Sequence, residues 1–160
     1  MKKTRIVIGD IFFVKTKRNK KKFFQYNAED STQLYGEVIR VFKKEYTLTE
    51  NPDLEEVLLK QVEFHTHTFI KEGIKSGYWV KIGHSENIGN LEVIFRDTDD
   101  YCEPEIKISS NWFIWKINEK RIDIGRMKKK YQNAEYGLIF APINVLERIN
   151  TGKNTVVYPK

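Results

Sequence analysis

Apolar, β-branched and aromatic residues recur along this chain in short runs whose spacing predicts β-strands. The runs lie at 6–14, 22–28, 38–42, 63–71, 78–80, 91–96, 112–117 and 134–140. The first two flank a basic turn around Asn19 and predict a hairpin. Runs 38–42 and 112–117 are apolar at nearly every position, which indicates strands buried on both faces.

Two segments have the pattern of short helices instead. In 51–60, Asn51 can cap a helix whose first position suits Pro52. In 142–150, apolar residues cluster on one face, and Gly152 provides the stop signal. Between these helices we expect loops around the short strand at 78–80, where glycines stand at 73, 77, 83 and 89.

The order of these elements predicts the fold class. Strands are not followed regularly by helices, so a parallel sheet with crossover helices is not expected. We predict an α+β fold of mostly antiparallel β structure, a barrel-like or strongly twisted sheet with about two short helices. The length of 160 residues suits a single β-rich domain over 1–160.

The net charge of +6 comes from two short basic segments, 15–22 and 126–130. They hold ten of the 28 basic residues, and the remaining 18 face 22 acidic residues, so the rest of the chain is mildly acidic. Lys20, Lys21 and Lys22 are expected to project from the hairpin tip, in front of aromatic strands. Such lysines can neutralise phosphates or meet an acidic protein surface, although blocks of like charge are commonly solvated loops.

The single cysteine, Cys102, excludes an internal disulfide and fits a reducing compartment. The basic start of the chain imitates a signal peptide, but the apolar run that follows is broken at Gly9 and Asp10. No stretch approaches the roughly 20 apolar residues that span a bilayer. We therefore expect a cytoplasmic protein without a membrane partner.

Two of the three histidines form a pair, His65 and His67, on one predicted strand. Alternate residues of a strand share a face, so both imidazoles are able to reach one metal ion. A third ligand is lacking nearby, His84 being the only other histidine, and Glu63 and Lys71 make the shared face look solvated. We expect no bound metal and no cofactor.

The acidic segment after the strand at 91–96 offers two further hypotheses. Asp97, Asp99 and Asp100 resemble the opening of a calcium loop, but the required glycine and distal glutamate are missing. Cys102 lies among carboxylates that raise a thiol pKa, which argues against a nucleophile. We interpret Asp97, Asp99, Asp100 and Glu103 as a surface that faces a basic partner. The alternative acidic surface consists of Glu50, Asp53, Glu55 and Glu56.

Short strings of residues occur along nearly the whole chain in a characteristic order. They are Gly9–Phe12, Phe24–Tyr26, Asp30–Leu34, Val38–Lys44, Gly73–Trp79, Ile82–Gly83, Gly89–Leu91, Ile108–Trp112, Trp115–Asn118 and Thr151–Lys153. In this order they resemble the immunity protein 26 family of bacterial polymorphic toxin systems. The resemblance implies a mostly β cytosolic protein that binds and neutralises a cognate toxin. It brings no enzymatic activity and no defined toxin-contacting residues.

The expected function is therefore non-catalytic toxin neutralisation through a protein interface. The alternative is a small basic β-rich module that binds nucleic acid through Lys20, Lys21 and Lys22, which we consider less favoured. An enzyme is the third possibility, and it rests on the histidines and carboxylates alone. Of the three tryptophans, Trp79, Trp112 and Trp115, we expect at least one in the core.

Overall fold

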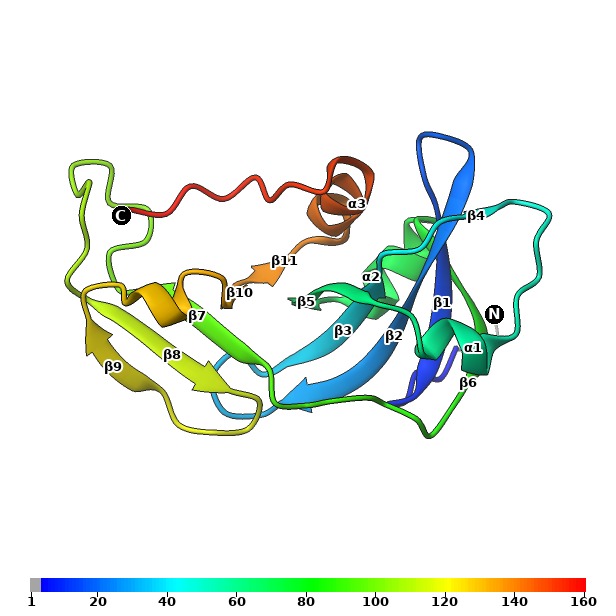
Figure 1. Ribbon diagram of the computed structural model, residues 1–160, viewed down its shortest axis with the longest axis horizontal. Helices are drawn as coiled ribbons and strands as arrows, with labels where there is room; N and C mark the ends of the chain where they lie inside the picture. The colour runs from blue at the N-terminus through cyan, green and yellow to red at the C-terminus, as the bar shows by residue number, and fades with distance from the viewer. Residues whose placement is uncertain (1–3) are drawn as a thin grey trace.

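The computed structural model describes residues 4–160 and divides them between two β-sheets that lie beside each other along the long axis of the molecule (Figure 1). In chain order the elements are β1 (Asp10–Lys15), β2 (Lys20–Asp30), β3 (Gly36–Phe42), β4 (Tyr46–Thr47), α1 (Leu54–Leu58), β5 (Val62–Thr68), α2 (Ile70–Lys75), β6 (Trp79–His84), β7 (Ile94–Thr98), β8 (Trp112–Lys116), β9 (Ile122–Gly125), the 3-10 helix η1 (Lys129–Tyr131), β10 (Glu135–Tyr136), β11 (Ile139–Phe140) and α3 (Pro142–Thr151). The prediction of a mostly antiparallel α+β fold is confirmed, with three α-helices in residues 4–160 instead of about two. The sheets are twisted, and the described residues close no barrel.

The first sheet has the strand order β11-β5-β3-β2-β1-β6, and β4 pairs with the start of β2. β1 and β2 form the predicted antiparallel hairpin, with Lys15 opposite Lys21. Asn19 in its turn has a φ of +54°, a conformation that asparagine tolerates better than most residues. β3 is buried at six of its seven positions, as its nearly continuous apolar pattern predicts.

The second sheet has the order β10-β7-β8-β9 and is built around β8. Trp112, Phe113, Ile114 and Trp115 of β8 are all buried, which confirms the prediction for this segment. The third tryptophan, Trp79 on β6, is also buried. All three tryptophans therefore belong to the interior.

The segment 134–140 is predicted as one central strand, and the structure corrects this. β10 pairs in parallel with β7 of the second sheet, whereas β11 pairs in parallel with β5 of the first. Between them, the Gly137 amide donates to the Arg96 carbonyl at 2.8 Å. A Cβ atom at Gly137 would lie 2.0 Å from the Trp115 ring, so only glycine allows this close approach. One short segment thus joins the two sheets.

The helices differ from prediction in two places. α1 is capped by Asp53, whose side chain accepts a hydrogen bond from the Glu55 amide, and not by Asn51. α2 begins in the segment 63–71, which was predicted as a strand, and continues where loops were predicted. α3 ends as predicted at Gly152, whose φ of +71° is the left-handed conformation of a glycine cap.

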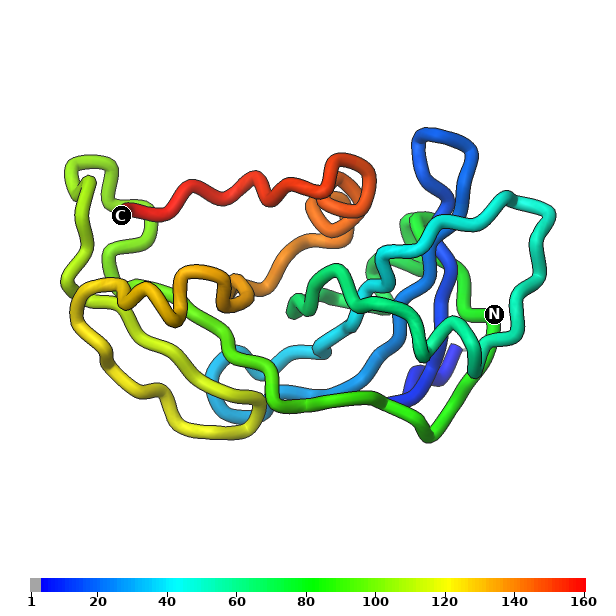
Figure 2. Tube along the Cα trace, in the orientation of Figure 1, coloured from blue at the N-terminus to red at the C-terminus, as the bar shows by residue number. Residues whose placement is uncertain are grey.

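The chain after α3 returns along the molecule to the far end of the second sheet (Figure 2). There it pairs with the loop that precedes β8: the Ser109 amide donates to the Lys160 carbonyl at 2.7 Å, and the Lys160 amide donates to the Lys107 carbonyl at 2.8 Å. Within residues 4–160, no helix combines the length and the apolar content that crossing a membrane requires.

Candidate functional site

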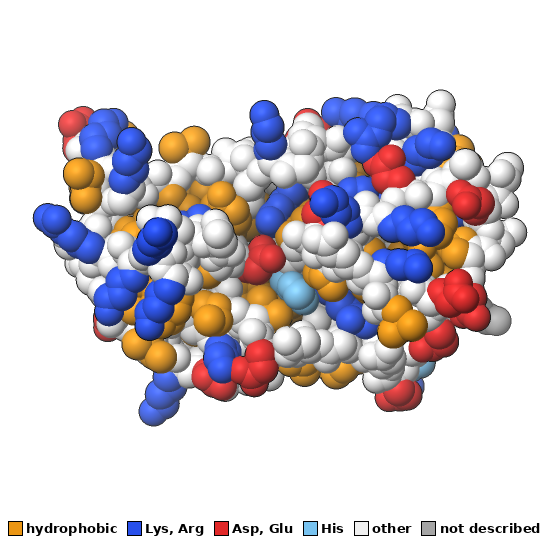
Figure 3. Space-filling model, in the orientation of Figure 1, with side chains coloured by type: hydrophobic (Ala, Val, Ile, Leu, Met, Phe, Trp, Pro, Cys, Tyr) orange, Lys and Arg blue, Asp and Glu red, His pale blue; other side chains and the backbone are white. Residues whose placement is uncertain are grey.

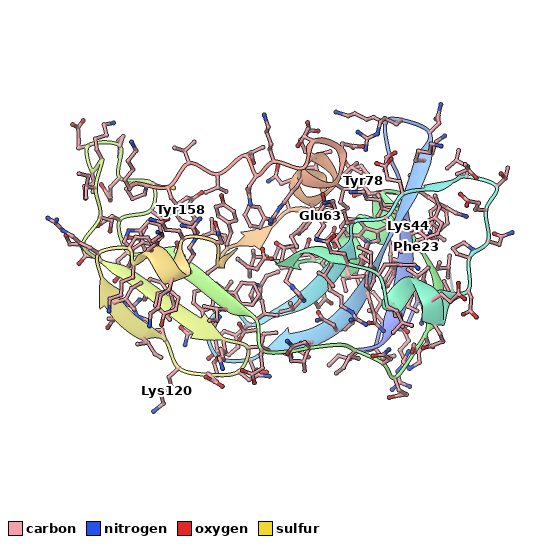
Figure 4. All side chains as sticks on the ribbon, in the orientation of Figure 1. Phe23, Lys44, Glu63, Tyr78, Lys120 and Tyr158 are labelled. Carbon is pink, nitrogen blue, oxygen red and sulfur yellow. The ribbon has the colours of Figure 1, made fainter. Side chains whose placement is uncertain are left out.

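The three lysines predicted at the hairpin tip lie on β2, and two of them are buried. Lys22 is 4% exposed, and its Nζ lies 2.6 Å from Oε2 of Glu63, a residue labelled in Figure 4. Lys21 is 8% exposed, and its Nζ donates to the Leu48 carbonyl at 3.4 Å. Only Lys20 is half-exposed. The expectation that all three project into solvent is wrong, because β2 is an inner strand flanked by β1, β3 and β4.

The residues that do form the tip are largely paired with acids. Lys17 lies 3.1 Å from Glu147 of α3, and Arg18 forms an ion pair with Glu45. Lys15 is exposed. The surface of this hairpin consequently presents less uncompensated positive charge than the sequence suggests.

The four acids predicted to face a partner have different environments. Asp99 pairs with both Nη atoms of Arg121, at 3.0 and 2.8 Å, and Asp100 accepts hydrogen bonds from neighbouring loop residues. Asp97 is half-buried, and burial raises the pKa of its carboxyl to about 6. Glu103 is exposed and forms no ion pair within residues 4–160. Glu103 is therefore the member of this set that is free to meet a partner.

The predicted histidine pair does not lie on a solvated face. His67 is fully buried, with its Nε2 3.0 Å from Oδ2 of Asp30, and Trp115 Nε1 donates to the same oxygen at 2.9 Å. Although burial opposes ionisation, these hydrogen bonds hold the pKa of Asp30 well below its usual range. The prediction of a solvated face failed because Phe95 and Trp115 of the second sheet pack against His67. The hydrogen bonds of Asp30 with His67 and Trp115 therefore link the two sheets.

His65 lies closer to the surface, at the junction of the two sheets. Burial and the nearby Arg40 charge lower the pKa of its imidazole to about 4. Its backbone amide donates to Glu135 Oε1 at 3.0 Å, and Arg148 Nη2 lies 3.4 Å from Glu135 Oε2. Burial also raises the pKa of Glu135. Figure 3 shows a histidine side chain next to an acidic one near the middle of the face that it draws.

His84 belongs to a separate cluster on β6. Its Nδ1 lies 3.0 Å from Asp10 Oδ1, and Lys81 Nζ lies 2.8 Å from Asp10 Oδ2. Hydrogen bonds with Glu86 and Asp10 raise the pKa of the imidazole. In the described part of the chain, no three His, Cys, Asp or Glu side chains converge as a metal ligand set.

An open groove of 890 Å³ lies between the loop that precedes β8 and the C-terminal segment. It is lined by Asp100, Cys102, Glu103, Pro104, Ile106, Lys107, Ile108 and residues 157–160. Ile108 is 63% exposed and Val157 is 88% exposed, so two large apolar side chains face solvent here. The groove thus combines an apolar surface with the free carboxylate of Glu103.

Several residues of these sites were not singled out by the sequence. Asp30 lies just beyond the predicted strand at 22–28, yet it is fully buried at the end of β2. Arg96 and Tyr158 line a second cavity beside the groove. No local pattern distinguishes these residues, because their partners come from distant parts of the chain.

Comparisons of the chain with family models, with curated proteins and with solved structures find no match.

Proposed function

We propose that this chain neutralises a protein toxin by binding it, without chemical action on it. The resemblance to the immunity protein 26 family supports this function, and the groove beside the C-terminal segment supplies a suitable surface. The observation that carries the proposal is the exposure of Ile108 and Val157 next to Glu103. Exposed apolar side chains surrounded by polar ones are typical of protein interfaces.

The groove residues fit the usual anatomy of an interface. Burial of Ile108 and Val157 against a partner would remove their apolar surface from water, which favours binding. The rim carries charges: Glu103 and Lys107 line the groove, and the exposed Glu105 lies between them in the same loop. Charges at a rim mainly govern the rate of association and the choice of partner.

The free carboxylates at the rim favour a basic toxin surface. Asp99 is paired with Arg121, and Asp100 accepts hydrogen bonds from its own loop, so Glu103 and Glu105 would supply most of the attraction. Association with the toxin should slow as salt concentration rises, and a charge reversal Glu103→Lys should reduce both the rate and its salt dependence.

The alternative of nucleic-acid binding through Lys20, Lys21 and Lys22 finds no specific support, because two of these side chains are buried. An RNA or DNA backbone cannot pair with the ammonium of Lys22 while that group is held by Glu63.

The test is co-expression with the toxin domain encoded beside this chain, scored by growth rescue and by co-purification. Wild type should rescue growth. Ile108→Glu should bind the toxin at least about tenfold more weakly, because it places a charge in the apolar centre of the interface. Leu59→Glu is the matched control, since Leu59 is 77% exposed but follows α1 at the opposite end of the molecule. Equal affinity of the two variants would refute the groove as the interface, and failure of wild type to bind would refute the function.

A further inference from the structure

A cavity of 640 Å³ lies next to the groove, between the second sheet and the C-terminal segment. Its walls are formed by Arg96, Ile108, Ser109, Trp112, Arg126, Met127, Gln132, Tyr136 and residues 156–160. Figure 4 shows Tyr158, a residue of the C-terminal segment, on the side of that segment that faces the second sheet. The volume lies within the range of pockets that hold small organic ligands.

Arg96 is one of the charged residues in the cavity wall, and aromatic rings surround its guanidinium. Its guanidinium carbon lies 5.7 Å from the ring centroid of Trp112, 5.2 Å from that of Tyr136 and 5.8 Å from that of Tyr158. Its Nε donates to the Ala134 carbonyl at 3.2 Å. Cation–π contacts on this scale orient a guanidinium without neutralising it.

The two Nη atoms of Arg96 have no hydrogen-bond or ion-pair partner within residues 4–160. Glu135 is near enough for the Arg96 charge to act on its pKa, but its own ion pair is with Arg148. A guanidinium presents its Nη atoms as a planar fork that matches the two oxygens of a carboxylate or phosphate. Arg96 therefore offers an oriented, unused donor pair.

The rest of the cavity is suited to an anion with an apolar body. Arg126 supplies a second positive charge, and no Asp or Glu side chain lines the walls. The apolar walls come from Ile108, Val156 and Val157, together with the aromatic rings. The basic segment 126–130 adjoins this cavity through Arg126, and Figure 3 shows many Lys and Arg side chains at the end of the molecule that carries the second sheet.

We infer that this cavity is a binding site for a small organic oxyanion, a carboxylate or phosphate carried on a flat aromatic or apolar body. The oxyanion pairs with the Nη fork of Arg96 and with Arg126. The body packs on Tyr136 and Tyr158, whose side chains are only half-buried. The inference does not depend on toxin neutralisation, because the site is complete within this chain.

The test measures binding of matched probes to the isolated chain by calorimetry and by NMR titration. Adenosine monophosphate is compared with adenosine, and benzoate with benzamide, so that each pair differs in the oxyanion. The anionic member of at least one pair should bind saturably and at least about tenfold more tightly than its neutral counterpart. Preferential binding of adenosine monophosphate would indicate a phosphate site, and preferential binding of benzoate would indicate a carboxylate site.

Two variants and one control connect binding to this cavity. Arg96→Lys keeps the charge but removes the planar fork, and Arg126→Gln removes an exposed charge with little risk to folding. Both substitutions should lower the affinity for the anion at least about tenfold. Lys128→Gln removes an equal charge from the same loop as Arg126 and should leave the affinity unchanged. The inference is overturned if neither anion binds saturably, if the neutral probes bind equally well, or if Lys128→Gln has the same effect as Arg126→Gln.

Discussion

Substitution of Asp30 by Asn tests how the two sheets are held together. The Asp30 side chain is fully buried and accepts five hydrogen bonds within the described chain. His67 and Trp115 approach Oδ2, while Thr32 and the Asn118 amide approach Oδ1. With the His67 proton on Nε2, every surrounding group donates to the carboxylate, and the amide NH₂ of an asparagine would meet donors. To accept from that NH₂, His67 would have to move its proton to Nδ1, which is buried without a hydrogen-bond partner among the described residues.

The cost follows from the hydrogen bonds that the substitution breaks. A hydrogen bond to a charged group contributes about 1.5–3 kcal/mol, and disruption of a buried charged network typically costs about 3–5 kcal/mol. We therefore expect Asp30→Asn to lower the free energy of unfolding by about 3–5 kcal/mol. The assay is urea unfolding followed by tryptophan fluorescence, with Asp123→Asn as a control because the Asp123 side chain is 72% exposed.

The same carboxylate predicts a pH dependence. The pKa of Asp30 is lowered in the folded protein from a usual value of 3.8. Its contribution to stability is therefore fully present above that value and is lost progressively as the pH falls further. The difference in free energy of unfolding between wild type and Asp30→Asn should be constant near neutral pH and should shrink below about pH 4. A loss under about 1 kcal/mol at pH 7, similar to that of the control, would refute the role of Asp30 as a tie between the sheets.

Three further changes in stability are expected. The pKa of Asp97 is about 6 in the folded protein against 3.8 ordinarily, so the folded state holds this proton more tightly than the unfolded state does. The free energy of unfolding of wild type should therefore fall by about 1–2 kcal/mol between pH 4 and pH 7, and that of Asp97→Asn should fall less. Lys22→Met should cost about 1–3 kcal/mol, because it leaves the Glu63 carboxylate without its partner at 2.6 Å, as urea unfolding will measure. Gly137→Ala should cost about 2–3 kcal/mol or more, because the new Cβ collides with the Trp115 ring, as thermal unfolding will measure.

The substitutions at Lys22 and Gly137 each have a matched control. Lys17→Met removes a lysine whose side chain is 71% exposed, and it should change stability by under about 0.5 kcal/mol. Gly36→Ala adds a Cβ whose nearest neighbour would lie at 3.6 Å, an ordinary contact, and it should be tolerated far better than Gly137→Ala. Equal losses in the paired variants would contradict the packing arguments, and an unchanged pH profile in Asp97→Asn would contradict the assignment of that proton.

The elements predicted correctly are those determined by local pattern. The β1–β2 hairpin and β3 follow from apolar runs and a basic turn, and α3 follows from one apolar face and its stop at Gly152. α2 was missed because Gly73 was interpreted as a loop residue. A Cβ at Gly73 would lie 1.7 Å from the Trp79 ring, so this glycine is present for packing against a distant tryptophan.

The candidate sites depend more on contacts between distant segments, which local pattern does not encode. The lysines of β2 looked exposed because the sequence does not show that β3 and β4 enclose their strand. His67 looked solvated because the second sheet, which covers it, is formed from residues far along the chain. The pairing of Asp99 with Arg121 likewise became visible only in three dimensions.

The proposed function makes a stoichiometric claim that one titration tests directly. Toxin activity is measured while increasing amounts of this chain are added at toxin concentrations far above the dissociation constant. A protein that neutralises by binding should reduce the activity linearly, to zero at a fixed ratio near one chain per toxin, and the toxin should recover its activity once the complex is dissociated. Complete inactivation by a small fraction of an equivalent, or activity that stays lost after separation, would contradict the account.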